Sequence, residues 1–338
     1  MIREAIAVLV DERRDLSEEE AAAAMRDILS GEATPAQLGA FLIALRLKGE
    51  TVDEIAGMAS VMREHSLKVE VKGPLLDTCG TGGDGQGTFN VSTAAAFVAA
   101  GAGARIAKHG NRAMTSGCGS ADVLEALGAK IDLSPEQVAE CIERTGFGFM
   151  FAQVFHPAMK HAAGPRREIG VRTVFNILGP LTNPAGAQHQ LLGVARPEIA
   201  ATIAQALQRL DSRHALVVHG TDGVDELSIS GPSMIHELSE GSLREYSVTP
   251  EDAGLSTAHA RAVRGGTPEQ NAAVLRAVVS GERGPLRDVV VLNTGAALLA
   301  ANAARDLKEG AMLAQESIDS GAAGRKLDEW VELTQSLG

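Results

Sequence analysis

The feature that most constrains how this chain folds is a glycine-rich loop between a short apolar segment and an alanine-rich one. The apolar segment, residues 75–78, is typical of a strand, and residues 92–100 are typical of a helix. Glycine recurs between them at Gly80, Gly82, Gly83, Gly85 and Gly87. Glycine permits positive φ and brings bare N–H groups close to an anion, and a helix start adds unpaired N–H groups. The stretch predicts a phosphate-binding site, with a mobile surface loop as the alternative.

Composition limits the classes of partner. The chain has 338 residues, of which 45% are hydrophobic and 22% are charged, as is ordinary for a globular protein large enough for two domains. A net charge of −12 argues against a nucleic-acid or anionic-membrane partner, because such contacts depend on Lys and Arg. An anionic substrate must therefore be held by a local basic cluster.

The cysteines and the apolar runs indicate the compartment. Cys79, Cys118 and Cys141 have neither metal-ligand spacing nor a paired framework, which favours free thiols in a reducing environment. No signal peptide is visible, and the longest run of small apolar residues, 94–104, is far below the ~18 residues that cross a membrane. We expect a cytoplasmic protein.

The periodicity changes near residue 72. Before that point apolar residues recur at helical spacing, and beyond it short apolar segments alternate with helical ones, which predicts a helical domain followed by an α/β domain with a mostly parallel sheet. Capping boxes mark helix starts at Ser17 with Glu20, Thr34 with Gln37, Thr51 with Glu54, Ser134 with Gln137 and Thr267 with Gln270. The predicted strands are 75–78, 104–107, 148–152, 189–194 and 215–219, with an antiparallel excursion over 234–248.

A second candidate loop follows the predicted strand 104–107. Residues 108–120 read KHGNRAMTSGCGS and end where another helix is predicted to begin. The donors in this loop are Lys108, Arg112, Thr115, Ser116 and Ser120. Parallel strands place their carboxyl ends at one edge of a sheet, so two such loops predict a ligand with two phosphorylated ends. A solvated loop is the alternative.

Two later segments carry concentrated charge. Arg166, Arg167 and Arg172 cluster within an acidic chain, either as a surface patch or as guanidinium groups that bind a substrate carboxylate. Residues 217–228 read VVHGTDGVDELS and supply Asp222, Asp225 and Glu226. Mg²⁺ usually binds one or two carboxylates plus substrate phosphates, whereas a solvated acidic turn is the alternative. Adjacent residues of an extended chain face opposite ways, so Asp225 and Glu226 share one ion only if the loop turns there, and otherwise serve two.

Together these segments resemble the anthranilate phosphoribosyltransferase family. The motifs GTGGD, NVST, KHGNR, GSADVLEALG, GVRTVFNILGPLTNP and DGVDE occur in the order and spacing of that family, over nearly the whole chain. The usual SSxxGSAD is TSGCGSAD here, with Thr115 keeping the hydroxyl, and Met159 stands at an HPAM position that is sometimes aromatic. The resemblance implies a fold of the nucleoside phosphorylase/phosphoribosyltransferase type. Its helical domain would comprise residues 1–72, completed by helices from about 158–183, and its α/β domain residues 73–338.

The resemblance also implies an activity and its residues. The chain would join anthranilate to phosphoribosyl pyrophosphate in tryptophan biosynthesis, as a homodimer formed through the helical domain, with Mg²⁺, two ions being favoured. Phosphoribosyl pyrophosphate would contact Gly80, Gly83, Asp84, Thr88, Asn90, Val91, Ser92, Thr93, Lys108, His109, Gly110, Asn111, Arg112, Ala113, Met114, Thr115, Ser116 and Ser120. Anthranilate would contact Gly80, Asn111, His156, Met159 and Arg166. Mg²⁺ would be held by Ser92, Asp225 and Glu226. No acid or base is assigned, because displacement of pyrophosphate by a neutral amine needs alignment and charge stabilisation.

Three other functions share parts of this pattern. A pyrimidine nucleoside phosphorylase has the same architecture but would not require the pair Asp225 and Glu226 or the Arg166 contact. A non-enzymatic, nucleic-acid-binding relative would have a basic surface, whereas this chain is acidic. A P-loop nucleotide hydrolase is disfavoured, since no Gly-Lys-Ser or Gly-Lys-Thr follows the glycine loop.

Overall fold

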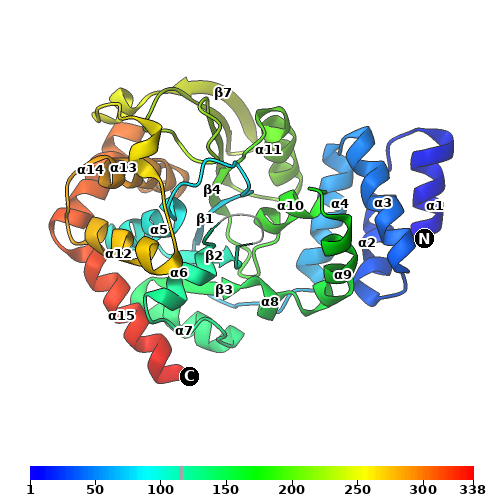
Figure 1. Ribbon diagram of the computed structural model, residues 1–338, viewed down its shortest axis with the longest axis horizontal. Coiled ribbons are helices and arrows are strands. Elements are labelled where there is room, and N and C mark those ends of the chain that lie inside the picture. Colours follow the sequence, from blue (N-terminus) through cyan, green and yellow to red (C-terminus); the bar gives the residue numbers. More distant parts are fainter. Residues whose placement is uncertain (114–116) are drawn as a thin grey trace.

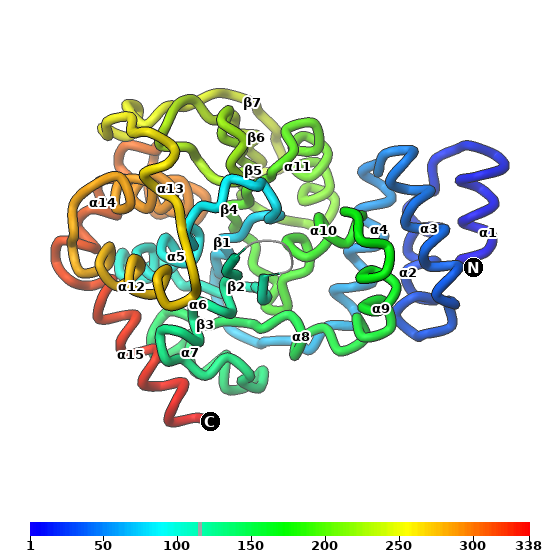
Figure 2. The backbone as a smooth tube through the Cα atoms, in the orientation of Figure 1, coloured from blue at the N-terminus to red at the C-terminus, as the bar shows by residue number. Residues whose placement is uncertain are grey.

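The structure is a computed structural model that describes residues 1–113 and 117–338. A small helical part, which contains the N-terminus, lies beside a larger α/β part (Figure 1). Figure 2 traces the chain from the helical part on the right to the last helix at the lower left. No helix within the described ranges is both long and apolar enough to span a membrane.

The helical part begins with α1 (Ile2–Ala7), α2 (Glu18–Ser30), α3 (Pro35–Lys48) and α4 (Val52–Glu64). The predicted capping boxes at Ser17, Thr34 and Thr51 are confirmed, because each side chain accepts a hydrogen bond from the third residue of its helix. Two helices from the middle of the chain, α9 (Lys160–Ile169) and α10 (Phe175–Leu178), lie against α3 and α4 respectively (Figure 1).

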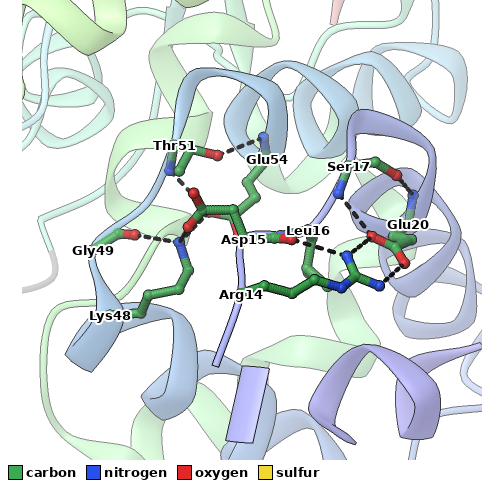
Figure 3. Close-up of polar contacts among 9 residues, drawn as sticks. All are labelled: Arg14, Asp15, Leu16, Ser17, Glu20, Lys48, Gly49, Thr51 and Glu54. Atoms are coloured by element: carbon green, nitrogen blue, oxygen red, sulfur yellow. Dashed lines mark hydrogen bonds and ion pairs between the residues drawn. The ribbon is translucent and has the colours of Figure 1, made fainter. Parts of the chain in front are cut away.

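Glu54 is a buried carboxylate that joins two loops of the helical part. It accepts hydrogen bonds from the backbone N–H groups of Leu16 and Thr51 at 2.9 and 2.8 Å, and it pairs with Lys48 at 3.0 Å (Figure 3). Lys48 also reaches Asp15 at 2.7 Å. The connection before α2 and the connection before α4 therefore share one ionic cluster.

The described strands form one sheet in the order β3-β2-β1-β4-β5-β6-β7. Their bounds are β1 Leu76–Gly80, β2 Ile106–Gly110, β3 Phe147–Phe151, β4 His189–Gly193, β5 His214–Gly220, β6 Ser233–Ser239 and β7 Ser242–Val248. β1 to β5 are parallel, and β6 and β7 are antiparallel additions, which confirms the mostly parallel sheet and the antiparallel excursion.

The second strand extends farther than the sequence indicated. β2 runs to Gly110, so Lys108 and His109 lie on the strand, although sequence reasoning placed them in the following loop. Both side chains are buried, and each has a hydrogen-bond partner in the protein. The predicted strand ends too early because charged and polar side chains break the apolar run that marks a buried strand.

Helices cover both faces of the sheet. The buried α5 (Val91–Gly101) packs against α13 (Pro285–Ala300) and α15 (Ala322–Leu337), and α11 (Ala200–Arg209) packs on β5. The remaining helices are α6 Ser120–Ala126, α7 Pro135–Thr145, α8 Ala152–Phe155, α12 Pro268–Val279 and α14 Leu307–Asp319, and the shorter turns are Val8–Glu12, Pro157–Met159, Gly179–Leu181, Pro197–Ile199, Pro250–Ala253 and Ala260–Val263. Hydrophobic residues form one core around α5 and a second core that the helical part shares with α11. The carboxyl ends of the parallel strands, with the loops that follow them, are left to form a site.

Candidate active site

The glycine loop leaves β1 and meets the acidic loop that follows β5. The Gly82 N–H donates a hydrogen bond to Asp225 Oδ2 at 2.7 Å. A Cβ atom on Gly80 would stand 2.4 Å from the same oxygen. Gly82 has a φ of +67°, which other residues rarely adopt. Glycine is therefore required at Gly80 for space and at Gly82 for backbone conformation.

The amino end of α5 is open toward this loop. Asn90 occupies the cap position, but its side chain does not accept a hydrogen bond from the first turn. The N–H groups at a helix start carry partial positive charge, which favours a bound phosphate. Asp84 Oδ2 and Thr93 Oγ1 are buried without a hydrogen-bond partner among the described residues. The loop and the helix start thus hold polar groups that a ligand could satisfy.

Asn90 links the glycine loop to the second loop. Its Nδ2 donates to the Cys118 carbonyl at 3.2 Å, and its Oδ1 accepts from Asn271 Nδ2 at 2.9 Å. Asn271 lies on the buried side of α12. Nothing in the sequence indicated Asn271, because one amide side chain in a helix far along the chain belongs to no motif. Thr88 lies in the same region and forms an isolated antiparallel bridge with Arg264.

The second loop is held by contacts within the protein. Arg112 pairs with Glu125 and, at 3.4 Å, with Asp122 on α6. The Ser120 hydroxyl, at the start of α6, donates to the Asn111 carbonyl at 3.4 Å. A ligand that binds Arg112 must therefore compete with two carboxylates.

Other residues of this loop have steric or structural contacts. Gly110 abuts Ser120, because a Cβ at Gly110 would stand 2.2 Å from the Ser120 hydroxyl oxygen. The Ala113 N–H donates to Asp122 Oδ2 at 2.9 Å. The predicted phosphate-binding residues Met114, Thr115 and Ser116 lie outside the described residues.

Lys108 is buried rather than displayed in a loop. Its side chain is 1% exposed, and its ammonium donates to the Thr78 carbonyl and to Ser92 Oγ, the latter at 3.3 Å. Burial lowers the pKa of Lys108 despite the nearby Asp77 carboxylate. Lys108 therefore joins β1, β2 and the first turn of α5.

Asp225 and Glu226 are adjacent buried carboxyl groups. Burial and the charge of Asp84 raise the pKa of Asp225 to about 6. Burial and the neighbouring Asp225 raise the pKa of Glu226, against a backbone hydrogen bond from Ser92 that lowers it. Two like charges in a buried site are stabilised by a bound cation, which favours their ionised forms.

This set of donors fits Mg²⁺. In the part of the chain that the structure describes, no three His, Cys, Asp or Glu side chains form a metal-binding group. Mg²⁺ needs only one or two carboxylates from the protein when water and substrate phosphates complete its shell. Asp222 is engaged elsewhere, because its Oδ2 accepts hydrogen bonds from Ser228 and Ser230 at 2.7 and 2.6 Å.

The arginine cluster seen in the sequence divides into three environments. The Arg166 guanidinium on α9 lies 4.8 Å from the centre of the Phe175 ring, and burial lowers its pKa. Arg172 donates a hydrogen bond to the Gly82 carbonyl, so it joins the segment after α9 to the glycine loop. Arg167 is exposed. The sequence pattern indicated Arg172 but not this contact.

His109 and His156 form a buried pair, with ring centres 5.0 Å apart. Burial lowers the pKa of His109 to about 3 and the pKa of His156 to about 4. His109 Nδ1 lies 3.2 Å from the Gly179 carbonyl. Both rings are therefore neutral at physiological pH. Met159 lies in the turn before α9 and packs against the core that the helical part shares with α11.

A small cavity lies between the helical part and the glycine loop. Its lining residues are Arg46, Glu50, Thr81, Arg172, Thr173, Asn176, Ile177, Arg196 and Ile199. Arginines from three separate segments meet there, one of them from α3. They provide the local positive charge that an anionic substrate requires in an acidic protein.

The fold and this site match a known class of protein. Residues 72–324 match the α/β domain of a glycosyl transferase family, and residues 3–66 match the helical bundle domain of that family. The chain is 59% identical over 336 residues to the anthranilate phosphoribosyltransferase of Chloroflexus aggregans, covering 99% of this chain and 98% of the relative.

Solved structures agree with this class. The anthranilate phosphoribosyltransferase of Thermus thermophilus superposes with a TM-score of 0.93 at 49% identity, covering 99% of each chain. The Saccharomyces cerevisiae enzyme in complex with phosphoribosyl pyrophosphate and Mg superposes with a TM-score of 0.91 at 31% identity, covering 99% of this chain and 98% of that one. The chain belongs to the anthranilate phosphoribosyltransferase family, a family of glycosyltransferase-type enzymes. The phosphorylase and nucleic-acid-binding alternatives find no support in these comparisons.

Proposed function

We propose that the chain transfers the phosphoribosyl group of phosphoribosyl pyrophosphate to the amine of anthranilate, giving N-(5-phosphoribosyl)anthranilate and pyrophosphate. The observation that carries this proposal is the meeting of three loops at one edge of the sheet. Gly82 binds Asp225, and Asn90 binds the Cys118 carbonyl, so both phosphate loops and the acidic loop share one site. The reaction is a step of tryptophan biosynthesis.

The sugar donor would lie across the two phosphate loops. The N–H groups of the glycine loop and of the α5 start would bind the pyrophosphate, and residues 108–120 the ribose phosphate. Lys108 would act through Ser92, because its ammonium is already bonded to the Thr78 carbonyl.

Mg²⁺ would be held by Ser92, Asp225 and Glu226. The metal supplies positive charge that offsets the negative charge on the departing pyrophosphate. Two ions are our favoured number, since Asp84 offers a further buried oxygen without a partner among the described residues. The yeast relative described above was solved with Mg and the sugar donor, which supports Mg²⁺ as the metal.

Anthranilate would lie between the glycine loop and α9. The Arg166 guanidinium would bind its carboxylate, with Gly80 and Asn111 on the side of the sugar donor. His156 and Met159 would line the ring. The cavity with Arg46, Arg172 and Arg196 supports an approach route for an anionic acceptor.

The residues of the chain would act by alignment rather than by proton transfer. The aromatic amine is neutral at physiological pH and can attack ribose C1 directly once it is positioned. The two neutral imidazoles, His109 and His156, have pKa values lowered by burial to about 3 and about 4. We therefore assign no acid or base.

We further propose that the chain works as a cytoplasmic homodimer. The dimer would form through the helical domain, residues 1–72 with helices from about 158–183, and the α/β domain would comprise residues 73–338. Val10 and Leu47 of the helical part, exposed at 53% and 83%, are apolar surface that such an interface could bury. Light scattering tests the proposal, and a monomer at working concentration would contradict it.

The activity assay tests the main proposal directly. Purified protein with Mg²⁺ and phosphoribosyl pyrophosphate should consume anthranilate, which is followed as loss of its fluorescence. Absence of any loss at high protein concentration, together with phosphorolysis of thymidine or uridine, would show that the chain is a nucleoside phosphorylase instead.

A further inference from the structure

The central sheet parts between β1 and β2, the two strands that lead into the phosphate loops. β1 pairs with β4, and β2 with β3, along their whole length. β1 and β2 pair only at Leu76 and Ile106, near their amino ends. The two strands therefore separate toward the edge where the loops begin.

Continuation of the parallel ladder beyond Leu76 and Ile106 would form two hydrogen bonds and use four backbone groups. The Thr78 carbonyl would accept from the His109 N–H, and the Ala107 carbonyl would accept from the Thr78 N–H. The Thr78 carbonyl accepts instead from Lys108 Nζ. The ladder is thus replaced by contacts to side chains.

Two more of these four groups, the His109 N–H and the Ala107 carbonyl, take side-chain partners. The His109 N–H donates to Asp77 Oδ1 at 3.2 Å. The Ala107 carbonyl accepts from Asn183 Nδ2 at 2.8 Å. The same Asn183 nitrogen donates to Asp77 Oδ2, also at 2.8 Å. Both protons of this amide are therefore used inside the gap between β1 and β2.

We call Asp77, Lys108 and Asn183 the polar wedge. Their exposed fractions are 1%, 1% and 6%, so all three polar groups are buried. A buried backbone group without a partner is strongly unfavourable, so the strands can stay apart only while these side chains satisfy them. The wedge therefore satisfies backbone groups that the separated strands would otherwise leave without partners.

We propose that the polar wedge sets the distance between the two phosphate-binding loops and so selects a donor whose two anionic ends have the matching separation. The inference rests on the proposed function. Gly80 follows Asp77 on β1, and Asn111 follows Lys108 and the end of β2, so each loop starts directly beyond the wedge. Asp77 and Asn183 are positioning residues, because they act through the strands and not on the substrate.

The affinity of a ligand that occupies one loop does not depend on the distance between the loops, whereas the affinity of a ligand that bridges both loops does. The test therefore compares pyrophosphate, ribose 5-phosphate and phosphoribosyl pyrophosphate, each titrated calorimetrically with Mg²⁺ present. Asp77→Asn keeps the size of the side chain but replaces one of its two acceptor oxygens by a nitrogen donor, which must face either Asn183 Nδ2 or the His109 N–H. Asn183→Leu removes the bridge. We expect both variants to bind each fragment within about threefold of wild type and to lose at least about tenfold in affinity for the whole donor.

A matched control and a rescue separate positioning from general damage. Glu237→Gln removes another buried carboxylate, on β6, which is bonded to His214 and Tyr246, and all three affinities should be unchanged. The double variant Asp77→Asn with Asn183→Asp restores one donor–acceptor pair and should regain part of the lost affinity. Asn183→Ser, which keeps one donor, replaces Asn183→Leu if the latter does not fold.

Equal loss of affinity for the fragments and the whole donor, or no loss at all, would overturn the inference. If wild type binds phosphoribosyl pyrophosphate but does not consume anthranilate, the proposed acceptor is wrong, and the proposal about the polar wedge still stands. If wild type binds none of the three ligands, both the proposed function and the proposal about the polar wedge are wrong.

Discussion

The Gly82 amide donates a hydrogen bond to Asp225 Oδ2 at 2.7 Å, which joins two loops that lie 143 residues apart in the chain. The same carboxylate oxygen leaves no room for a side chain at Gly80. The predicted phosphate loop and the predicted metal-binding loop are therefore one unit. A substitution in either loop should therefore change the geometry of the other loop.

Gly80→Ala tests this unit. The added methyl group would force Asp225 away, since its Cβ would stand 2.4 Å from Oδ2. We expect kcat to fall about a hundredfold, because a displacement of about 1 Å at an active site has that effect. Gly39→Ala is the control, because nothing lies within 4 Å of a Cβ there. Full activity of Gly80→Ala would disprove the steric coupling.

The double variant Asp225→Asn with Glu226→Gln tests the metal role. We expect turnover to be lost at ordinary Mg²⁺, because both anionic ligands are gone. The metal-free variant should melt no lower than wild type, because burial and mutual repulsion already raise the pKa of both carboxyl groups. Retained turnover would refute the assignment, and calorimetric melting measures the second effect.

Arg166→Ala tests recognition of the acceptor. If the guanidinium binds the carboxylate of anthranilate, its loss should raise the KM for anthranilate about ten- to a hundredfold and leave the KM for the sugar donor nearly unchanged. Arg167→Ala, on the exposed side of α9, is the matched control. An equal rise in both KM values would reassign Arg166.

Glu54→Ala tests the cluster that joins the loops of the helical part (Figure 3). The change leaves Lys48 without one partner and the Leu16 and Thr51 N–H groups without acceptors. We expect a loss of about 3 kcal/mol or more in the free energy of unfolding, measured by denaturant titration. Glu12→Ala, which removes an exposed pair with Arg14, should stay within about 1 kcal/mol. Similar losses in the two variants would contradict a special role for Glu54.

His156→Gln tests the buried histidine pair by its pH dependence. Burial lowers the pKa of His156 from 6.5 to about 4, so below about pH 6.5 the unfolded chain binds a proton that the folded protein does not. His156 therefore costs wild type up to about 1.4 kcal/mol of stability per pH unit as the pH falls through that window. The variant lacks this contribution, whereas the similar contribution of the buried His109 stays in both proteins. The difference in the free energy of unfolding between wild type and the variant should become smaller from about pH 7.5 to about pH 5 in urea titrations. A difference in the free energy of unfolding that does not change with pH would show that His156 is not buried as a neutral ring.

Much of the fold was predictable, because its signals are local. Capping boxes at Ser17, Thr34 and Thr51 depend on residues three apart, and each helix starts where they indicated. Apart from β2, the predicted parallel strands differ from the observed ones by at most two residues at either end. The β2 prediction failed at Lys108 and His109, whose burial depends on partners from other segments.

The roles of two buried amide side chains could not be predicted. Asn271 and Asn183 each lie far along the chain from the loops that they support. Asn271 belongs to no motif, and Asn183 lies in the motif GVRTVFNILGPLTNP, but its position there does not indicate which groups it bonds. The role of each asparagine follows only from the groups with which it forms hydrogen bonds in the folded protein.

The sequence by itself determined the glycine loop, the helix starts and the family, because these depend on residue types at fixed short spacings. The tertiary structure alone decided that Lys108 is buried and that Asp225 accepts a hydrogen bond from Gly82. It also decided that Asp77 and Asn183 bond backbone groups between β1 and β2. The physical reason is that a buried polar group must find a partner, and its partner is chosen by the packing of segments that are remote in the chain.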